Sequence, residues 1–255
     1  MKNFDKYYKV ALEATKRAGS FLRDSYGQTK EMTHKSGTHF GIADDVESNK
    51  IIEDYLRSHT PEVAIYSEEG ERNLESKLVW IIDPIDGTSN YRVEIPMFVT
   101  QLCLLSDGEP VVSVIRAPVL DLVFSAQKNK GAFLNDEKIM VSETSEISRG
   151  MFGFNKGSNN LDVGKYITQL GPIVRTIRIY GAMGMDLAYV ASGKLDALIN
   201  SGSDLYNFAP GVLLVREAGG VAVNFDGKDW KSNDKTLLAT NKNLVEEVLK
   251  ILQNK

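Results

Sequence analysis

The 255-residue chain is 42% hydrophobic and 25% charged, which is the composition of an ordinary globular protein with one large core or two fused smaller ones. Its 30 basic and 34 acidic residues give a formal net charge of -4, so it lacks the basic excess that binding to a nucleic acid polymer requires. No stretch approaches the ~20 consecutive apolar residues of a membrane span, and the charged N-terminus argues against a signal peptide, so we expect a soluble, cytoplasmic protein.

The first part of the chain alternates between helical and extended patterns. Apolar residues at three- and four-residue spacing predict a helix over 4–25, and a second helix is expected to begin near Asp44. The run 79–82 is wholly apolar, as is typical of a strand buried on both faces. From 99 to 141, short strands separated by turn residues predict an antiparallel meander.

The remainder alternates again, with helices expected over 184–192, 208–218 and 244–252 and strands over 197–200 and 221–225. Helices before and after a strand-rich middle favour layered α/β or α+β packing.

The composition shifts near 142–150, which is rich in Ser, Thr and Glu. We therefore divide the chain into an N-terminal α+β subdomain, 1–143, and a C-terminal α/β subdomain, 144–255. The first is expected to carry the metal and phosphate site and the second to complete the substrate pocket. We expect the two subdomains to form one compact unit.

The segment 83–88, Asp-Pro-Ile-Asp-Gly-Thr, carries the strongest functional signal because it directly follows the apolar run. Its polar groups are expected at the carboxyl end of a strand, where open α/β sheets bind ligands. Pro84 biases Asp83 towards an extended conformation, so Asp83 and Asp86 can converge on one point as the chain turns. Two close carboxylates repel each other unless a cation lies between them, and oxygen ligands suit Mg²⁺ or Mn²⁺ rather than zinc. If a helix begins here, the amides of 87–89 face a phosphate.

Two further acidic elements precede this segment. Glu68 and Glu69 follow the apolar residues 63–65, and Asp44 stands at the start of a predicted helix. Each has a simpler alternative, because an acidic pair at a strand end is usually a solvated turn and Asp44 can be a helix N-cap.

Residues 83–91, Asp-Pro-Ile-Asp-Gly-Thr-Ser-Asn-Tyr, resemble the signature of the inositol monophosphatase family, within the wider superfamily of lithium-sensitive, magnesium-dependent phosphatases. The resemblance covers nearly the whole chain and includes 67–69, 131–135, 207–211 and 217–220. It implies the layered αβαβα sandwich (α+β) of inositol monophosphatases and fructose-1,6-bisphosphatases, and a homodimer. It also implies hydrolysis of a small phosphate monoester by a water activated by Mg²⁺, with Mn²⁺ as the alternative metal.

The resemblance assigns roles to the matching positions. One metal ion would be held by Glu68, Asp83 and the carbonyl of Ile85, and a second by Asp83, Asp86 and the residue at 207. Asp44 and Thr88 would position and deprotonate the attacking water. The assigned residues are, for catalysis, Asp44, Glu68 and Thr88; for metal, Glu68, Asp83, Ile85, Asp86 and Asn207; for phosphate, Gly87, Thr88 and Ser89; and for substrate, Asp86, Gly181, Ala182 and Asn207.

The first departure from the family pattern is Asn207, where members usually have an aspartate. An asparagine offers one carbonyl oxygen to a metal but no negative charge. The second metal is therefore expected to bind more weakly. The alternative is that Asn207 merely caps the helix expected over 208–218.

The second departure concerns the substrate. Seven residues before position 207, inositol phosphatases commonly place a glutamate that contacts a ring hydroxyl, and here the residue is Asn200. The loop 200–206 also lacks the usual tryptophan next to the metal-binding aspartate. The candidate substrates are therefore inositol monophosphate and, as alternatives, 3′-phosphoadenosine 5′-phosphate, histidinol phosphate and fructose 1,6-bisphosphate.

Two hypotheses from other classes compete with a phosphatase. Asn207 motivates a catalytically weakened relative that binds phosphorylated metabolites or metals without efficient turnover. A purely structural module would leave the acids at 44, 68, 83 and 86 without a reason to converge.

Overall fold

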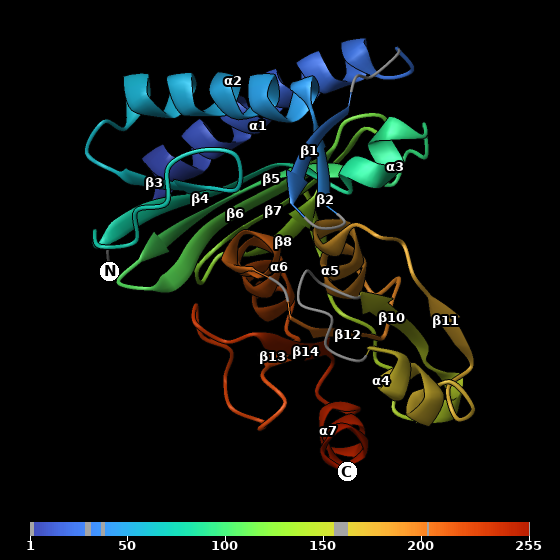
Figure 1. Cartoon of the computed structure of the whole chain (residues 1–255). Helices are drawn as coiled ribbons and strands as arrows, with labels where there is room; N and C mark the ends of the chain where they lie inside the picture. Colours follow the sequence, from blue (N-terminus) through green and yellow to red (C-terminus); the bar gives the residue numbers. More distant parts are fainter. Residues whose placement is uncertain (1–2, 29–31, 37–38, 156–162, 203, 255) are drawn as a thin grey trace.

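Two β-sheets alternate with three layers of helices in the computed structural model, which describes residues 3–28, 32–36, 39–155, 163–202 and 204–254 (Figure 1). Helices α1 and α2 cover one face of the larger sheet, and α5 and α6 lie between the two sheets. Helices α4 and α7 cover the outer face of the smaller sheet. The predicted αβαβα sandwich is confirmed.

The first helical layer consists of α1 (Asp5–Ser25) and α2 (Ala43–His59), close to the predicted positions. Small residues at three- and four-residue spacing in α1, among them Ala11, Ala14 and Ala18, are fully buried against α2 and the larger sheet. A hairpin of β1 (Met32–Ser36) and β2 (His39–Ile42) joins the two helices.

The larger sheet has the strand order β3-β4-β5-β6-β7-β8-β9, with β3 parallel to β4 and every other neighbouring pair antiparallel. The meander predicted over 99–141 is confirmed. The strands are β3 (Ala64–Ser67), β4 (Leu78–Asp86), β5 (Val99–Ser106), β6 (Glu109–Ala117), β7 (Leu122–Gln127), β8 (Gly131–Leu134) and β9 (Glu137–Ile139).

Strand β4 differs from the prediction, because it continues through the acidic segment instead of ending before it. Asp83 is paired with Gln101 of β5 and Asp86 with Val99, and the register shifts between the two pairs. Pro84 has no N–H to give to the ladder, so the shift falls where regular pairing is impossible. Asp83 and Asp86 are therefore positioned by an irregularity within β4, and not by a turn that follows the strand.

The smaller sheet has the strand order β11-β10-β12-β14-β13. Its strands are β10 (Met151–Asn155), β11 (Thr176–Arg178), β12 (Ala197–Ser201), β13 (Val221–Val223) and β14 (Thr236–Thr240). The chain passes from the larger to the smaller sheet between Ile139 and Met151, the interval that contains the composition shift. The remaining helices are α3 (Thr88–Arg92), the 3₁₀ turn η1 (Ile147–Arg149), α4 (Val163–Leu170), α5 (Met183–Ala191), α6 (Leu205–Glu217) and α7 (Val245–Gln253).

Helices α5 and α6 pack closely because a glycine lies at their contact. A Cβ atom at Gly211 would stand 2.3 Å from the Cβ of Leu187, so no larger residue fits. Both helices share one apolar core with the larger sheet, in which Phe208, Val212 and Trp230 are almost fully buried. The helical layer of α5 and α6, which lies between the two sheets, is therefore closely packed.

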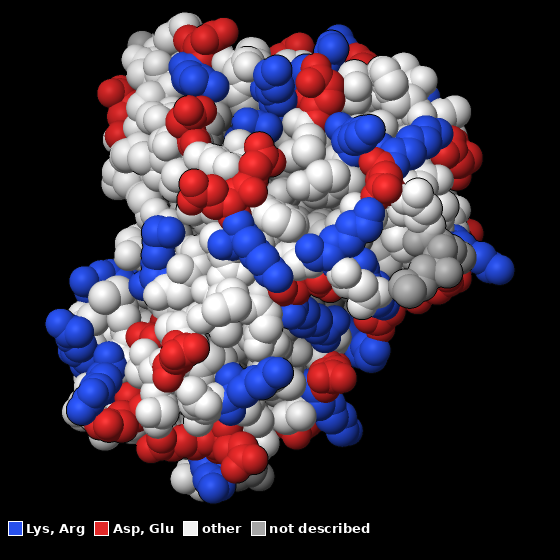
Figure 2. Space-filling model, turned by 180° about the vertical axis from the view of Figure 1, so that it is seen from behind, with Lys and Arg blue, Asp and Glu red and all other residues white. Residues whose placement is uncertain are grey.

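The molecular surface carries both signs of charge. Basic and acidic side chains are interspersed over the face in Figure 2, in agreement with a formal net charge of -4. Within the described ranges, no helix combines the length and the apolar composition needed to cross a bilayer.

Candidate functional site

The parallel pair β3–β4 brings Glu68 and Asp83 to one edge of the larger sheet. Ser67 lies opposite Ile82 in the ladder, and the amide of Glu68 donates to the carbonyl of Ile82 at 3.2 Å. Because both strands run in the same direction, the residues that follow these partners emerge side by side. Glu68 is half-buried, whereas only 1% of Asp83 is exposed.

Asp83 is a buried carboxyl group with one oxygen satisfied. Its Oδ2 accepts a hydrogen bond from Nε2 of Gln101 at 3.2 Å, while Oδ1 is buried and has no donor among the described residues. Burial, followed by the charges of Glu68 and Asp86, raises the pKa of Asp83 well above its usual range. A buried carboxylate oxygen without a partner is costly unless a cation binds it.

Asp86 ties the acidic segment to the beginning of α5. Its two oxygens accept from the amides of Met183 at 3.0 Å and Gly184 at 2.5 Å. Burial raises the pKa of Asp86 to about 7, although these two amides favour the charged form. The sequence-predicted residues Gly181 and Ala182 immediately precede these amides, so the structure brings them next to Asp86.

Gly87 allows the chain to turn tightly after Asp86. Its φ of 89° lies in the left-handed region, and a Cβ atom there would stand 3.0 Å from both the Cβ of Ala182 and the carbonyl of Met97. The turn begins α3, whose first residues are Thr88 and the exposed Ser89.

The sequence-based prediction gave the attacking water to Asp44 and Thr88, and the structure places Asp45 beside Thr88. The Thr88 hydroxyl lies 3.4 Å from Oδ1 of Asp45 and 2.9 Å from the carbonyl of Ile85, and it can donate to either. Asp44 instead accepts from the Tyr91 hydroxyl at 2.6 Å.

The two acids differ in burial, because they lie on different stripes of α2. Asp45 lies seven residues before Ile52 and eleven before Leu56, and all three are buried along one stripe of α2. Asp44 is one residue out of phase with this stripe. Asp44 has the same spacing to Ile51 and Tyr55, which are only partly buried, so periodicity alone does not single out Asp45 in the sequence.

Asn207 lies inside α6 rather than at its cap. The helix begins at Leu205 with Asp204 as the N-cap residue, so the alternative that Asn207 caps this helix is wrong. The neighbouring Tyr206 is buried, and its pKa is raised first by burial and then by the charge of Glu68. The beginning of α6 therefore lies within electrostatic reach of the acidic segment.

Asn200 is fully buried near the carboxyl end of β12, the central strand of the smaller sheet. Its amide nitrogen donates to the carbonyl of Asn155 at 2.8 Å, whereas its Oδ1 has no partner among the described residues. Asp186 of α5 is also fully buried, with one oxygen accepting from Asn155 at 3.3 Å and the other unpartnered within the described ranges. Unsatisfied acceptors therefore lie on the second sheet as well as at Asp83.

The site fits a hard cation in the type of its ligands. In the described part of the chain, no three acidic, histidine or cysteine side chains form a ready-made metal cluster. Mg²⁺ does not need one, because it usually binds one or two carboxylates and completes its shell with water and substrate phosphate. The unpartnered oxygen of Asp83 and the carbonyl of Ile85 supply oxygen ligands of this kind.

Metal-free protein is expected to lose stability as the pH rises, because folding raises the pKa of Asp83 and Asp86. A folded state that binds more protons than the unfolded state is favoured at low pH, and this advantage disappears as the pH passes through about 7 for Asp86. At higher pH, a cation bound to the ionised carboxylates restores the stability that is lost. At a hundred times its dissociation constant, Mg²⁺ should raise the melting temperature by roughly 5–10 °C at pH 8 and by less than half as much at pH 5. Calorimetry with NaCl at equal ionic strength as the control tests this, and equal shifts at both pH values contradict it.

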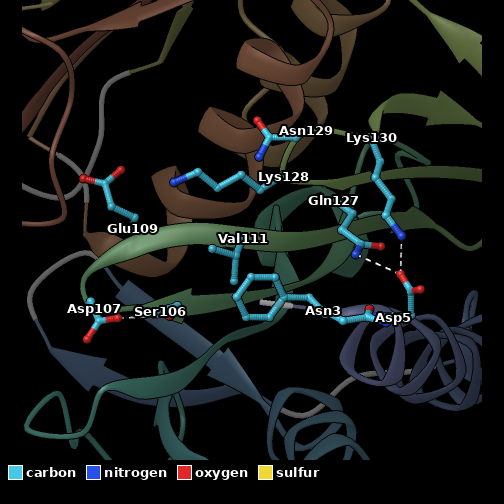
Figure 3. A pocket seen from close by; sticks show the side chains of 11 residues that line it. Asn3, Asp5, Ser106, Asp107, Glu109, Val111, Gln127, Lys128, Asn129 and Lys130 are labelled. Atoms are coloured by element: carbon cyan, nitrogen blue, oxygen red, sulfur yellow. Dashed lines mark hydrogen bonds and ion pairs between the residues drawn. The ribbon is translucent and has the colours of Figure 1, made fainter. Parts of the chain in front are cut away.

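A cavity of about 520 Å³ lies away from these acids, between the start of α1 and the hairpin turns after β5 and β7 (Figure 3). Phe4 and Val111 form its apolar part. Gln127 and Lys130 both contact Asp5, so these polar groups already have partners. Among the acids that line this cavity, Asp5 and Glu109 are each paired with a lysine, unlike the buried carboxylates at 83–88.

The comparisons with known proteins agree on one family. The model of the "Inositol monophosphatase family" matches residues 3–255. The chain is 31% identical to "Inositol monophosphatase 1" of Solanum lycopersicum, covering 98% of this chain and 96% of the relative. It is also 31% identical to "Fructose-1,6-bisphosphatase/inositol-1-monophosphatase" of Thermotoga maritima, over 95% and 94% of the two chains.

A solved structure agrees with these sequence matches. The extragenic suppressor protein SuhB of Bartonella henselae superposes with a TM-score of 0.91 at 28% identity, covering 96% of this chain and 98% of that one. Fold and sequence therefore point to the same assignment along the whole chain. The chain belongs to the inositol monophosphatase family.

Proposed function

We propose that the protein hydrolyses a small phosphate monoester of the inositol monophosphate type, in a reaction that depends on Mg²⁺ and uses water as the nucleophile. The observation that carries the proposal is the buried Oδ1 of Asp83, which has no hydrogen-bond partner in the described part of the chain and is set among the charges of Glu68, Asp86 and Asp45. When bound, Mg²⁺ supplies Lewis-acid chemistry, acidifying water and neutralising charge on the phosphate and the leaving oxygen.

The proposed metal ligands are all oxygen atoms, in line with Mg²⁺ or Mn²⁺ and unlike the nitrogen and sulfur ligands that zinc prefers. They are Glu68, Asp83, the carbonyl of Ile85, Asp86 and Asn207. Asn207 is the weakest of these, because an amide oxygen carries no net charge.

We assign the positioning and deprotonation of the attacking water to Thr88 with Asp45. When the Thr88 hydroxyl donates to Asp45, its oxygen still has lone pairs that accept a hydrogen bond from water, so Thr88 can take a proton from water as it passes its own proton to Asp45. Asp45 is buried and its other oxygen is held by the amide of Ile42 at 2.8 Å, so the carboxylate is fixed in orientation. A fixed acceptor is what general-base chemistry requires.

The phosphate and the rest of the substrate are proposed to lie on either side of Asp86. The amides of Gly87, Thr88 and Ser89 begin α3 and take no part in its intrahelical hydrogen bonds, so they are suited to phosphate oxygens. Asp86, Asn207 and the loop at Gly181 and Ala182 are proposed to contact the hydroxyl-bearing part of the substrate.

Replacement of Asp45 by Asn should lower kcat by about 10²–10⁴-fold, because the acceptor for the water proton is lost while the shape is kept. Asp44→Asn is the matched control, since it places the same substitution one residue away. It is expected to change kcat by less than about threefold and to reduce stability through Tyr91. Steady-state kinetics on both variants decides, and a larger loss in Asp44→Asn would reinstate the sequence-based assignment.

Release of inorganic phosphate from a panel of substrates tests the proposed reaction. The panel holds inositol 1-phosphate, fructose 1,6-bisphosphate, histidinol phosphate and 3′-phosphoadenosine 5′-phosphate. One relative carries both fructose-1,6-bisphosphatase and inositol-1-monophosphatase in its name, which makes the first two substrates the leading pair. Mg²⁺-dependent turnover of at least one substrate is expected, and no turnover with either Mg²⁺ or Mn²⁺ contradicts the proposal.

The family resemblance also supports two further proposals, inhibition by lithium and assembly as a homodimer. Lithium is expected to lower the rate at saturating Mg²⁺. Sedimentation should give twice the mass of 28.3 kDa.

A further inference from the structure

Gln101 is a fully buried polar residue in the apolar strand β5, directly opposite Asp83 in the ladder. A glutamine at such a position must satisfy both ends of its amide or bear the cost of an unmade hydrogen bond. Its Nε2 donates to Oδ2 of Asp83 at 3.2 Å, while its Oε1 has no partner within the described residues. Only this amide orientation gives Asp83 a donor, because the opposite one would set two acceptors against each other.

The other end of the Gln101 amide rests against the beginning of α5. A Cβ atom at Gly184 would stand 2.6 Å from Oε1 of Gln101 and 3.0 Å from its Cδ, so this contact requires a glycine. The amide of the same glycine donates to Oδ2 of Asp86 at 2.5 Å. One side chain therefore donates to Asp83 and packs against the residue that holds Asp86.

We propose that Gln101 is a positioning residue for the metal site, which fixes Oδ2 of Asp83 and leaves Oδ1 as the oxygen available to a divalent cation. The inference rests on the proposed function, in which Asp83 and Asp86 bind that cation. Groups that orient a metal ligand without touching the metal typically change metal affinity by about 10- to 100-fold when they are removed.

Replacing Gln101 with Leu keeps the approximate volume and removes the donor. We expect the dissociation constant for Mn²⁺, measured by electron paramagnetic resonance without substrate, to rise about 10- to 100-fold. Thr100→Val is the matched control, because Thr100 is the fully buried neighbour in β5 and its side chain points to the opposite face. This control should stay within about twofold of wild type, and urea unfolding verifies that both variants fold.

The outcomes separate this inference from the proposed function. A folded Gln101→Leu protein that binds Mn²⁺ within twofold of wild type overturns the positioning role and leaves the proposed function standing. Wild-type protein that binds no Mn²⁺ overturns the proposed function itself. If Gln101→Leu does not fold, the Gln101→Asn variant tests the positioning role instead. Its side chain is one methylene shorter, so the amide donor lies farther from Asp83. A raised dissociation constant in this variant supports the role, and an unchanged one refutes it.

Discussion

Replacement of Asp83 by Asn should abolish phosphate release, with a loss on the order of 10³-fold or more in kcat/KM. Asp83 carries a buried oxygen that has no partner within the described ranges, and the charges of Glu68, Asp86 and Asp45 act on it. Removing the charge of Asp83 weakens the binding of every metal ion that Asp83 contacts. A bound metal ion contributes several kcal/mol of transition-state stabilisation. Steady-state kinetics at saturating Mg²⁺ measures the loss.

Asp107→Asn is the control for this variant, because it makes the same change in the exposed turn at the far end of β5. Asparagine tolerates the positive φ of 52° at that position, so the fold should be kept. Near-wild-type activity is expected in the control. Asp83→Asn protein that retains more than about a tenth of the wild-type rate would mean that Asp83 is not a metal ligand.

Replacement of Asn207 by Asp should lower the Mg²⁺ concentration needed for half-maximal activity by about tenfold or more. A unit charge near a cation is worth up to ~4 kcal/mol at a separation of about 4 Å in a partly solvated site, and the amide supplies none of this. Asn207 lies in the first turn of α6, where the neighbouring Tyr206 is within reach of the charge of Glu68, so a carboxylate there is expected to add to the anionic character of the proposed second metal site. Titration of activity with Mg²⁺ gives the answer.

Asn243→Asp serves as the control, since it adds the same charge beside the beginning of α7, away from the site. It should leave the Mg²⁺ requirement unchanged. If Asn207→Asp also raises the maximal rate by orders of magnitude, the wild-type chain is the catalytically weakened relative that Asn207 suggests. If neither the Mg²⁺ requirement nor the rate changes, Asn207 does not contact a metal.

The layered fold could be predicted largely because its main elements have strong periodic patterns. The helix α1 and the meander from Val99 are long enough for their spacing to be read directly from the sequence. The strands β10, β11 and β14 were missed, since each is three to five residues long and their pairing depends on distant partners. Short strands take their stability from neighbours rather than from intrinsic preference.

The limits of the site prediction follow from similar causes. The motif at 83–88 was recognised from its own residues, but its position inside β4 was not, because β4 continues past a proline through a register shift. Asp45 and Asp44 are adjacent in sequence, and about 100° of helical rotation separates them in space. Gln101 could not be identified as a site residue from the sequence, because its proposed role depends on a partner in the neighbouring strand β4 and on a glycine in α5.

The central claim is that the acidic segment binds the divalent cation that the reaction requires. An anomalous difference map from a crystal soaked in Mn²⁺ tests this most directly. We expect a peak at coordinating distance, about 2.0–2.3 Å, from Oδ1 of Asp83, with Glu68 and Asp86 around it. An active protein whose map has no peak near Asp83, or whose Mn²⁺ lies elsewhere, would contradict the account.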